Sequence, residues 1–262
     1  LSICCPVQVN AVIPSFCLHY LTECREYLDY SGDLAFLREI YPKLVSIAEV
    51  FTGHMENGLV MPFDGKDQCW YWNFYEWREG LDGGNTDMSV PELVLNSLLS
   101  IALQNLASIG DRLGMENDYA EQARRLNDRI HETFWDEKEG LCHNLPQGGR
   151  SSQLGNALAI LCGAVTGSQA KSLCERLEKD QSMTKISLSM LCFKYDAWLK
   201  VDRERYAPVI LEDIERVYKP MVEYGSTTVW ETEIGQSDFG DAGSLCHGWS
   251  AMPIYYYHIL LK

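Results

Sequence analysis

Hydrophobic residues recur at helical spacing along almost the whole chain, and this periodicity constrains the fold more than any other feature. In the segment 15–31, for example, Cys17, Leu21, Cys24 and Leu28 fall on one helix face. No segment alternates convincingly as a strand does. We therefore expect an all-α fold. The spacing predicts nine helices, over residues 15–31, 33–51, 89–113, 116–135, 151–165, 168–179, 185–201, 203–218 and 244–260.

The connections between these segments are of two kinds. Some are tight, at 31–32, 110–114 and 167–168, and others are long, aromatic and rich in Gly and acids, at 57–88, 136–150 and 219–243. Long loops are uncommon unless they carry function. We expect a ring of helical hairpins within one domain, 1–262, with the site at the long-loop end. Pro42 is expected to break or kink the second helix.

Charge and cysteine usage exclude several function classes. The 262 residues include 22 Lys and Arg against 37 Asp and Glu, which gives a net charge of −15. This charge argues against nucleic acid and against an anionic membrane surface as partners. No run approaches the roughly 18 uninterrupted apolar residues of a spanning helix. The ten cysteines lack Cys-x-x-Cys spacing, so we expect free thiols in a reducing compartment and a cytoplasmic location.

An aromatic segment at 70–84 is the first candidate binding element. Three tryptophans, two tyrosines and a phenylalanine fall within residues 70–77, without a helical stripe. Aromatic rings present flat apolar faces on which sugar rings stack, and the nearby carboxylates can accept hydrogen bonds from hydroxyls. These carboxylates are Glu76, Glu79 and Asp82. The alternative is a loop whose aromatic side chains cover the hydrophobic core.

A second candidate lies at 225–251. Glu231 and Glu233 would share one face if this segment were extended. Ser244 has the character of a helix N-cap, which would place His247 near the start of a helix. A carboxylate followed by a histidine and Trp249 can activate water and bind hydroxyls. The alternatives are a solvated loop carboxylate and a histidine satisfied in the core.

Neither a cofactor nor a metal site is expected. The glycine-containing stretches 80–84 and 148–151 lack the preceding strand and the Lys-plus-hydroxyl ending of a phosphate loop. No set of histidines and carboxylates has metal-ligand spacing.

Several motifs in order resemble the C-terminal part of the catalytic domain of bacterial α-L-rhamnosidases, glycoside hydrolase family 78. The most specific pair is Thr227-Thr228-Val229-Trp230-Glu231 followed by the segment 244–253, Ser-Leu-Cys-His-Gly-Trp-Ser-Ala-Met-Pro. Other matching stretches are Ile13-Pro14-Ser15-Phe16, Tyr30-Ser31-Gly32-Asp33, Tyr41-Pro42, the loop Trp72-x-Phe74-x-Glu76-Trp77, and Asn156-Ala157-Leu158.

The resemblance implies an (α/α)6 barrel that hydrolyses terminal α-L-rhamnosides with inversion. It implies that Glu231 is the general base and that His247 and Trp77 contact the sugar. Trp230 would wall the site, and Trp72 and Glu76 of the aromatic loop complete the binding candidates. The family's general acid precedes the matched region, and residues 1–14 contain no acid. We therefore expect about three quarters of a barrel, incomplete at its N-terminus.

Some alternatives stay open on the sequence. Glu76 stands where many relatives have Asp, and Glu233 rivals Glu231 as the base. A different glycosidase on the same barrel, or a non-catalytic carbohydrate-binding module, would also fit these residues. Whether the chain forms a homo-oligomer is left open.

Overall fold

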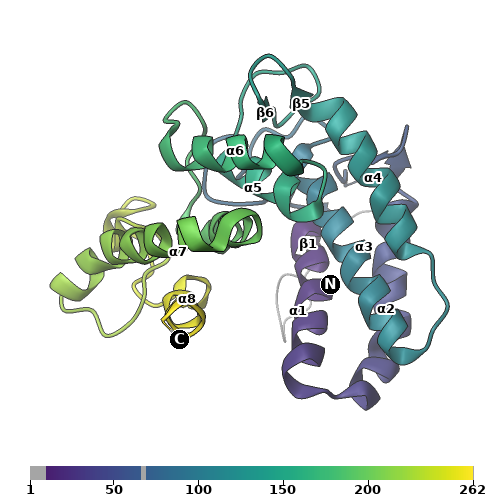
Figure 1. The fold of residues 1–262 in the computed structure, drawn as a ribbon, viewed down its shortest axis with the longest axis horizontal. Coiled ribbons are helices and arrows are strands. Elements are labelled where there is room, and N and C mark those ends of the chain that lie inside the picture. Colours follow the sequence, from purple (N-terminus) through teal and green to yellow (C-terminus); the bar gives the residue numbers. More distant parts are fainter. Residues whose placement is uncertain (1–9, 66–68, 262) are drawn as a thin grey trace.

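The computed structural model describes residues 10–65 and 69–261, and the regular secondary structure of this part of the chain is mostly helical. Alternate helices pack side by side in the order α1, α3, α5, α7, and they follow one another in an open arc (Figure 1). The predicted all-α hairpin fold is thus confirmed. The α-helices are α1 (Pro14–Ser31), α2 (Leu34–Thr52), α3 (Leu93–Leu113), α4 (Tyr119–Phe134), α5 (Gln153–Cys162), α6 (Gly167–Lys179), α7 (Leu191–Glu223) and α8 (Pro253–Leu260).

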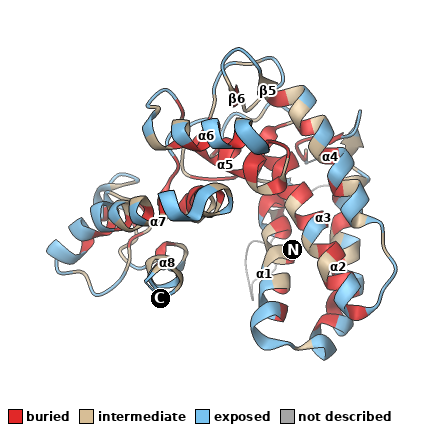
Figure 2. Ribbon diagram, viewed as in Figure 1, coloured by how far each residue is buried: buried red, intermediate tan, exposed pale blue. Residues whose placement is uncertain are grey.

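The helices α2, α4 and α6 form an outer layer. The α2 helix packs on α1 and α3, α4 packs on α3, and α6 packs on α5 and α7, while α8 contacts α7. Figure 2 shows buried residues along α3 and α5 and exposed residues on the outward side of α6. Two layers of helices, one inside the other, are what a ring of helical hairpins requires.

The described strands are short, and each pairs with one other strand. The strand β1 (Ala11–Val12) pairs in parallel with β4 (Trp70–Tyr71), which fastens the aromatic segment beside the start of α1. Antiparallel pairs join β2 (Met55–Glu56) to β3 (Leu59–Val60) and β5 (Trp135–Asp136) to β6 (Leu141–Cys142). Short 3-10 helices lie at Leu188–Met190 (η1), Gly235–Ser237 (η2) and Gly248–Ser250 (η3).

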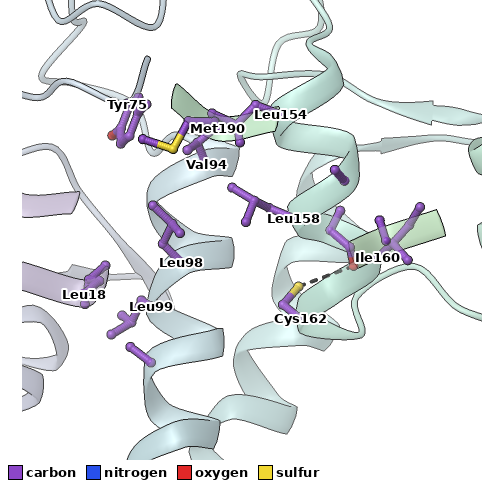
Figure 3. Close-up of a cluster of buried hydrophobic side chains, with 14 of the residues drawn as sticks. Leu18, Tyr75, Val94, Leu98, Leu99, Leu154, Leu158, Ile160, Cys162 and Met190 are labelled. Atoms are coloured by element: carbon purple, nitrogen blue, oxygen red, sulfur yellow. Dashed lines mark hydrogen bonds between the residues drawn. The ribbon is translucent and has the colours of Figure 1, made fainter. Parts of the chain in front are cut away.

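The core lies between the inner helices. Figure 3 shows Leu98 of α3 and Leu158 of α5 within one cluster of buried side chains. Among the described residues, α3 is the one helix long and apolar enough to cross a membrane. Within its most apolar window, 78% of the residues are buried inside the fold, which is the environment of a core helix.

Most of the described cysteines belong to this core, as predicted. Cys142, Cys162 and Cys174 are buried free thiols. The buried cysteines also include Cys17 and Cys24 on one face of α1, whereas Cys246 is exposed. Cys4 and Cys5 lie outside the described residues.

The two ends of the hairpins differ as the loop lengths predict. At the short-connection end, Arg112 of α3 donates to the Leu28 carbonyl of α1. At the other end the long loops meet one another. Arg78 of the aromatic loop donates to Glu233 and to the Lys185 carbonyl, and Arg150 donates to Glu79. The candidate residues of two long loops are therefore brought to one end of the molecule.

Two details of the helix prediction need correction, and a third is confirmed. Pro42 does not break α2, because buried side chains on both sides of it, from Leu37 to Phe51, hold the helix against its neighbours. The two helices predicted on either side of residue 202 are confirmed, because α7 consists of two helices that meet at a kink at Asp202, whose backbone angles (φ −156°, ψ 89°) are non-helical. This change of direction lets one continuous stretch supply two helical segments.

The predicted helix over 244–260 is wrong in its first half. The helix α8 begins only at Pro253, with Met252 as its N-cap. Ser244 is not a helix cap, since its hydroxyl group bonds the backbone N–H and C=O of Cys246. Pro253 lacks the N–H that a continuing helix would need, so Pro253 is favoured in the first turn. His247 therefore lies in a loop.

Candidate active site

The aromatic loop both plugs the core and presents partly exposed rings. Phe74 is buried, whereas Trp72 and Trp77 are half-buried. The three rings pack together, with centroids 4.8 Å apart for Trp72–Phe74 and 4.7 Å for Phe74–Trp77. The loop closes on itself because the N–H groups of Tyr75 and Glu76 both donate to the Leu81 carbonyl. The two interpretations of this segment each hold in part. Phe74 helps to cover the core, whereas the rings of Trp72 and Trp77 are partly exposed, as a binding element requires.

Glu76 is enclosed within this loop. Its side chain is fully buried, and its Oε2 accepts a hydrogen bond of 2.6 Å from the Ser187 N–H. Its Oε1 is buried without a hydrogen-bond partner in the described residues. Burial raises the pKa of Glu76 to about 7, although the Ser187 N–H and the charge of Arg78 oppose the shift. The carboxyl group predicted to bind sugar is closed off from solvent in this structure.

Arg78 connects the aromatic loop to the C-terminal loops, and the sequence reasoning did not select it. Its Nη2 lies 3.0 and 3.2 Å from the two carboxylate oxygens of Glu233, and its Nε donates to the Lys185 carbonyl at 2.9 Å. In the sequence, Arg78 stands out only as the single arginine in a long loop rich in acidic residues. The charge of Glu233 is paired by this contact.

Glu231 is held mainly by backbone groups. Its N–H donates to the Ser244 carbonyl at 2.8 Å, and its Oε2 accepts from the Ser244 N–H at 3.2 Å. The Trp249 indole N–H donates to the Glu231 carbonyl at 3.0 Å. The segment 231–237 consists of bends, turns and a 3-10 helix. The extended conformation expected for Glu231 and Glu233 is therefore absent, and the two carboxylates have different partners.

Trp230 is buried, with its Nε1 donating to the Ser226 hydroxyl at 3.1 Å. Gly235 is required beside it. A Cβ at Gly235 would lie 2.7 Å from the Trp230 ring, and the Gly235 φ of +60° is one that side-chain-bearing residues rarely adopt. The packing of Trp230 against Gly235 fixes the turn that follows Glu231.

His247 stacks on Trp249, with ring centroids 3.8 Å apart and an interplanar angle of 24°. Its Nδ1 is buried without a hydrogen-bond partner in the described part of the chain. His247 lines an open cavity of about 460 Å³, and Trp249 lines another of about 710 Å³ between α1, α7 and α8. Through Trp249, His247 and Glu231 form one packed unit.

The candidate residues thus fall into two groups. Trp72, Glu76 and Trp77 belong to the aromatic loop, and Trp230, Glu231 and His247 belong to the C-terminal loops. The Arg78–Glu233 ion pair joins the two groups. A second link is the contact between the Trp77 and Phe239 rings, whose centroids are 5.0 Å apart. One end of the fold therefore carries partly exposed aromatic rings, the ion-paired carboxylate of Glu233 and the carboxylate of Glu231, which has fewer hydrogen-bond partners.

One group of residues could hold a metal ion. Asp136, Glu139 and His143 bring their ligand atoms within 4.8 Å of one another at the β5–β6 hairpin. The sequence reasoning missed this group because the hairpin turn, not regular spacing, brings the three together. His143 Nε2 lies 3.6 Å from Asp136, which a plain ion pair with a protonated imidazole also explains.

An arc of helical hairpins, with aromatic and carboxylate side chains at its long-loop end, defines the class of helical six-hairpin glycosidase domains. The comparison with protein families places the chain more closely. The family of the bacterial α-L-rhamnosidase six-hairpin glycosidase domain matches residues 5–260. The chain belongs to this family.

Solved structures agree on the fold. A family 78 rhamnosidase of Bacillus sp. GL1 superposes with a TM-score of 0.83 at 24% identity, over 97% of this chain and 27% of that one. A rhamnosidase from Klebsiella oxytoca with rhamnose bound gives 0.79 at 19% identity, over 98% and 48%. An α-L-rhamnosidase from Aspergillus terreus gives 0.58 at 18% identity, over 86% and 26%. The chain therefore spans less than half the length of each of these proteins. No curated protein matches it.

Proposed function

We propose that the chain forms part of the catalytic domain of an inverting α-L-rhamnosidase, with Glu231 as the general base. The family match and the rhamnose bound by the Klebsiella oxytoca protein support the substrate class. On this proposal the partner is a rhamnose-containing glycoside. We also propose a cytoplasmic location, which rests on the cysteine usage and not on the family match.

The observation that carries the role of Glu231 is its contrast with Glu233. A general base needs a carboxylate oxygen that water can reach. Glu233 has both oxygens on Arg78, whereas Glu231 is bonded by a single backbone N–H and is half-buried. No partner of Glu231 Oε1 lies within the described residues. This contrast favours Glu231 as the base.

The inverting reaction requires a second carboxyl group, the acid, at about 6.5–9.5 Å from the base. The resemblance to family 78 implies that this acid comes from a segment upstream of the matched motifs. In the proposed reaction Glu231 takes a proton from water as the water attacks the anomeric carbon. His247 and Trp249, stacked together, and the partly exposed rings of Trp72 and Trp77 would bind the sugar.

The test uses the protein as its gene encodes it in full. We expect it to release 4-nitrophenol from 4-nitrophenyl α-L-rhamnoside but not from the corresponding β-D-glucoside. Proton NMR should show β-L-rhamnose as the first product, which is the inverted anomer. Turnover of another glycoside alone would indicate a different glycosidase on this fold. Sugar binding without turnover of any glycoside would indicate a carbohydrate-binding module.

A further inference from the structure

A cavity of about 320 Å³ lies between the segment 75–94 and the loop 144–150, and the proposed hydrolysis does not use it. Tyr75 and Glu76 are adjacent, yet their side chains reach different elements. Tyr75 donates to Glu92 at the start of α3 and lines this cavity, whereas Glu76 reaches Ser187. We infer that the cavity is a second binding site, which takes one ring of a neutral sugar.

The floor of the cavity carries a buried carboxyl group. Glu92 is 9% exposed, and its Oε2 accepts a hydrogen bond of 2.5 Å from the Tyr75 hydroxyl, which is itself buried. No partner of Glu92 Oε1 lies within the described residues. Because Glu92 lines the cavity, this oxygen is open to a hydroxyl group of a ligand there.

The protonation of Glu92 suits a hydroxyl ligand. Burial, together with the nearby charge of Asp87, raises the pKa of Glu92 to about 7, although the Tyr75 hydroxyl opposes this shift. Near neutral pH the carboxyl group can therefore either donate to or accept from a hydroxyl. A sugar hydroxyl both donates and accepts, so it can match either state.

The walls add amide groups and apolar side chains. Asn85 and Asn144 line the cavity, and Asn144 Oδ1 accepts from the Ser152 hydroxyl at 2.8 Å, which leaves its NH₂ donors for a ligand. Leu81 and Val94 supply apolar surface. Mixed amide, carboxyl and apolar lining fits the hydroxyl edge and the C–H face of a sugar ring. The volume lies at the lower end of the about 300–1,000 Å³ typical of small-molecule sites.

The charged groups that line the cavity favour a neutral ligand over an anion. Glu92 and Asp87 line the cavity, and its one cationic side chain, Arg150, is paired with Glu79. An anion such as a phosphate or a sugar acid would meet these carboxyl groups without a free cation. A single metal ion would leave most of the 320 Å³ unfilled. The ring can be the second sugar of a bound glycoside or a separate monosaccharide, which has the same chemistry.

The first arm of the test measures binding, so it does not depend on the role of Glu231. The full-length protein is titrated with D-glucose, D-galactose, D-glucuronate and CaCl₂, followed by saturation-transfer NMR and calorimetry. A double variant, Tyr75→Phe with Glu92→Leu, removes the polar floor without leaving one partner orphaned, so folding is expected to survive. Asn85→Trp blocks the mouth from an exposed position, and Gln147→Trp is the matched exposed control outside the lining.

We expect saturable binding of a neutral monosaccharide. The double variant and Asn85→Trp should each weaken it by about tenfold or more, and Gln147→Trp should not change it. Three results would overturn the inference: no saturable binding of either neutral sugar, binding unaffected by both cavity variants, or binding of only glucuronate or calcium. Asn85→Trp decides the outcome if the double variant proves unfolded by circular dichroism.

The second arm tests whether the bound sugar ring is the second ring of the glycoside substrate or a separate monosaccharide. In a Glu231→Gln background, the affinities for methyl α-L-rhamnoside and for 6-O-α-L-rhamnosyl-D-glucose are compared with and without the double variant. Selective weakening of the disaccharide supports a second ring of the substrate. Unchanged affinities for both, together with lost monosaccharide binding in the first arm, support a separate sugar.

Discussion

At the residue scale, identical side chains acquire different chemistry from their contacts. Glu76 is buried against the Ser187 N–H, Glu233 is paired with Arg78, and Glu231 is held by the Ser244 N–H. The sequence identifies Glu231 and Glu76 as candidates, but their surroundings could not be predicted from spacing. The contacts of Glu76 and Glu233 join residues more than one hundred positions apart.

The raised pKa of Glu76 makes a prediction about stability. Because the folded pKa of about 7 exceeds the ordinary value of 4.5, the folded protein keeps a proton that the unfolded chain releases. Glu76 therefore contributes stability below about pH 4.5 that is lost as the pH rises through 7. Glu76→Gln keeps an uncharged acceptor for Ser187, so its stability relative to the wild type should rise with pH.

Urea unfolding of both proteins at pH 5 and pH 8 measures this effect. We expect the difference in unfolding free energy between Glu76→Gln and wild type to change by roughly 1–3 kcal/mol in favour of the variant. Comparing the two proteins cancels the contributions of other titrating groups, including Glu92. A difference that stays the same at both pH values would mean that Glu76 does not hold a proton in the folded state.

At the element scale, helices were predictable and loop contacts were not. Periodic burial located every α-helix, since the pattern for each arises within the helix itself. The start of α8 was predicted too early because serine often caps helices. The hydroxyl group of Ser244 instead bonds the backbone of Cys246 in a turn. The long loops were expected to meet, but Arg78, which ties the aromatic loop to 185 and 233, gave no periodic signal.

Arg78→Met tests whether this tie holds the loops together. The variant loses the contact of Nη2 with both Glu233 oxygens, which is half-buried, and the exposed bond to the Lys185 carbonyl. We expect the free energy of unfolding to fall by about 1–2 kcal/mol. Arg150→Met is the control, because its ion pair with Glu79 is exposed and its loss should change the free energy of unfolding little. Equal losses in the two variants would show that Arg78 has no special part in joining the loops.

At the scale of the whole molecule, the inner helices share one continuous core. Leu158 of α5 is fully buried within the cluster drawn in Figure 3. We expect Leu158→Ala to cost about 2–5 kcal/mol of unfolding free energy, since the rigid helices around it cannot close the cavity. The control is Val222→Ala at the end of α7, where the side chain is 73% exposed and the change should be near zero. Urea unfolding measures both, and a small loss for Leu158→Ala would contradict a shared core.

The central claim is that Glu231, and not Glu233, activates water in a rhamnosidase. The most direct measurement is kcat on 4-nitrophenyl α-L-rhamnoside for Glu231→Gln and Glu233→Gln, made in the full-length protein. The account predicts that Glu231→Gln lowers kcat by about 10²–10⁴-fold, as expected when a general base is removed. Glu233→Gln, which loses an ion pair with Arg78, should retain kcat within about tenfold. Wild-type kcat in Glu231→Gln, or the large loss in Glu233→Gln alone, would contradict the account.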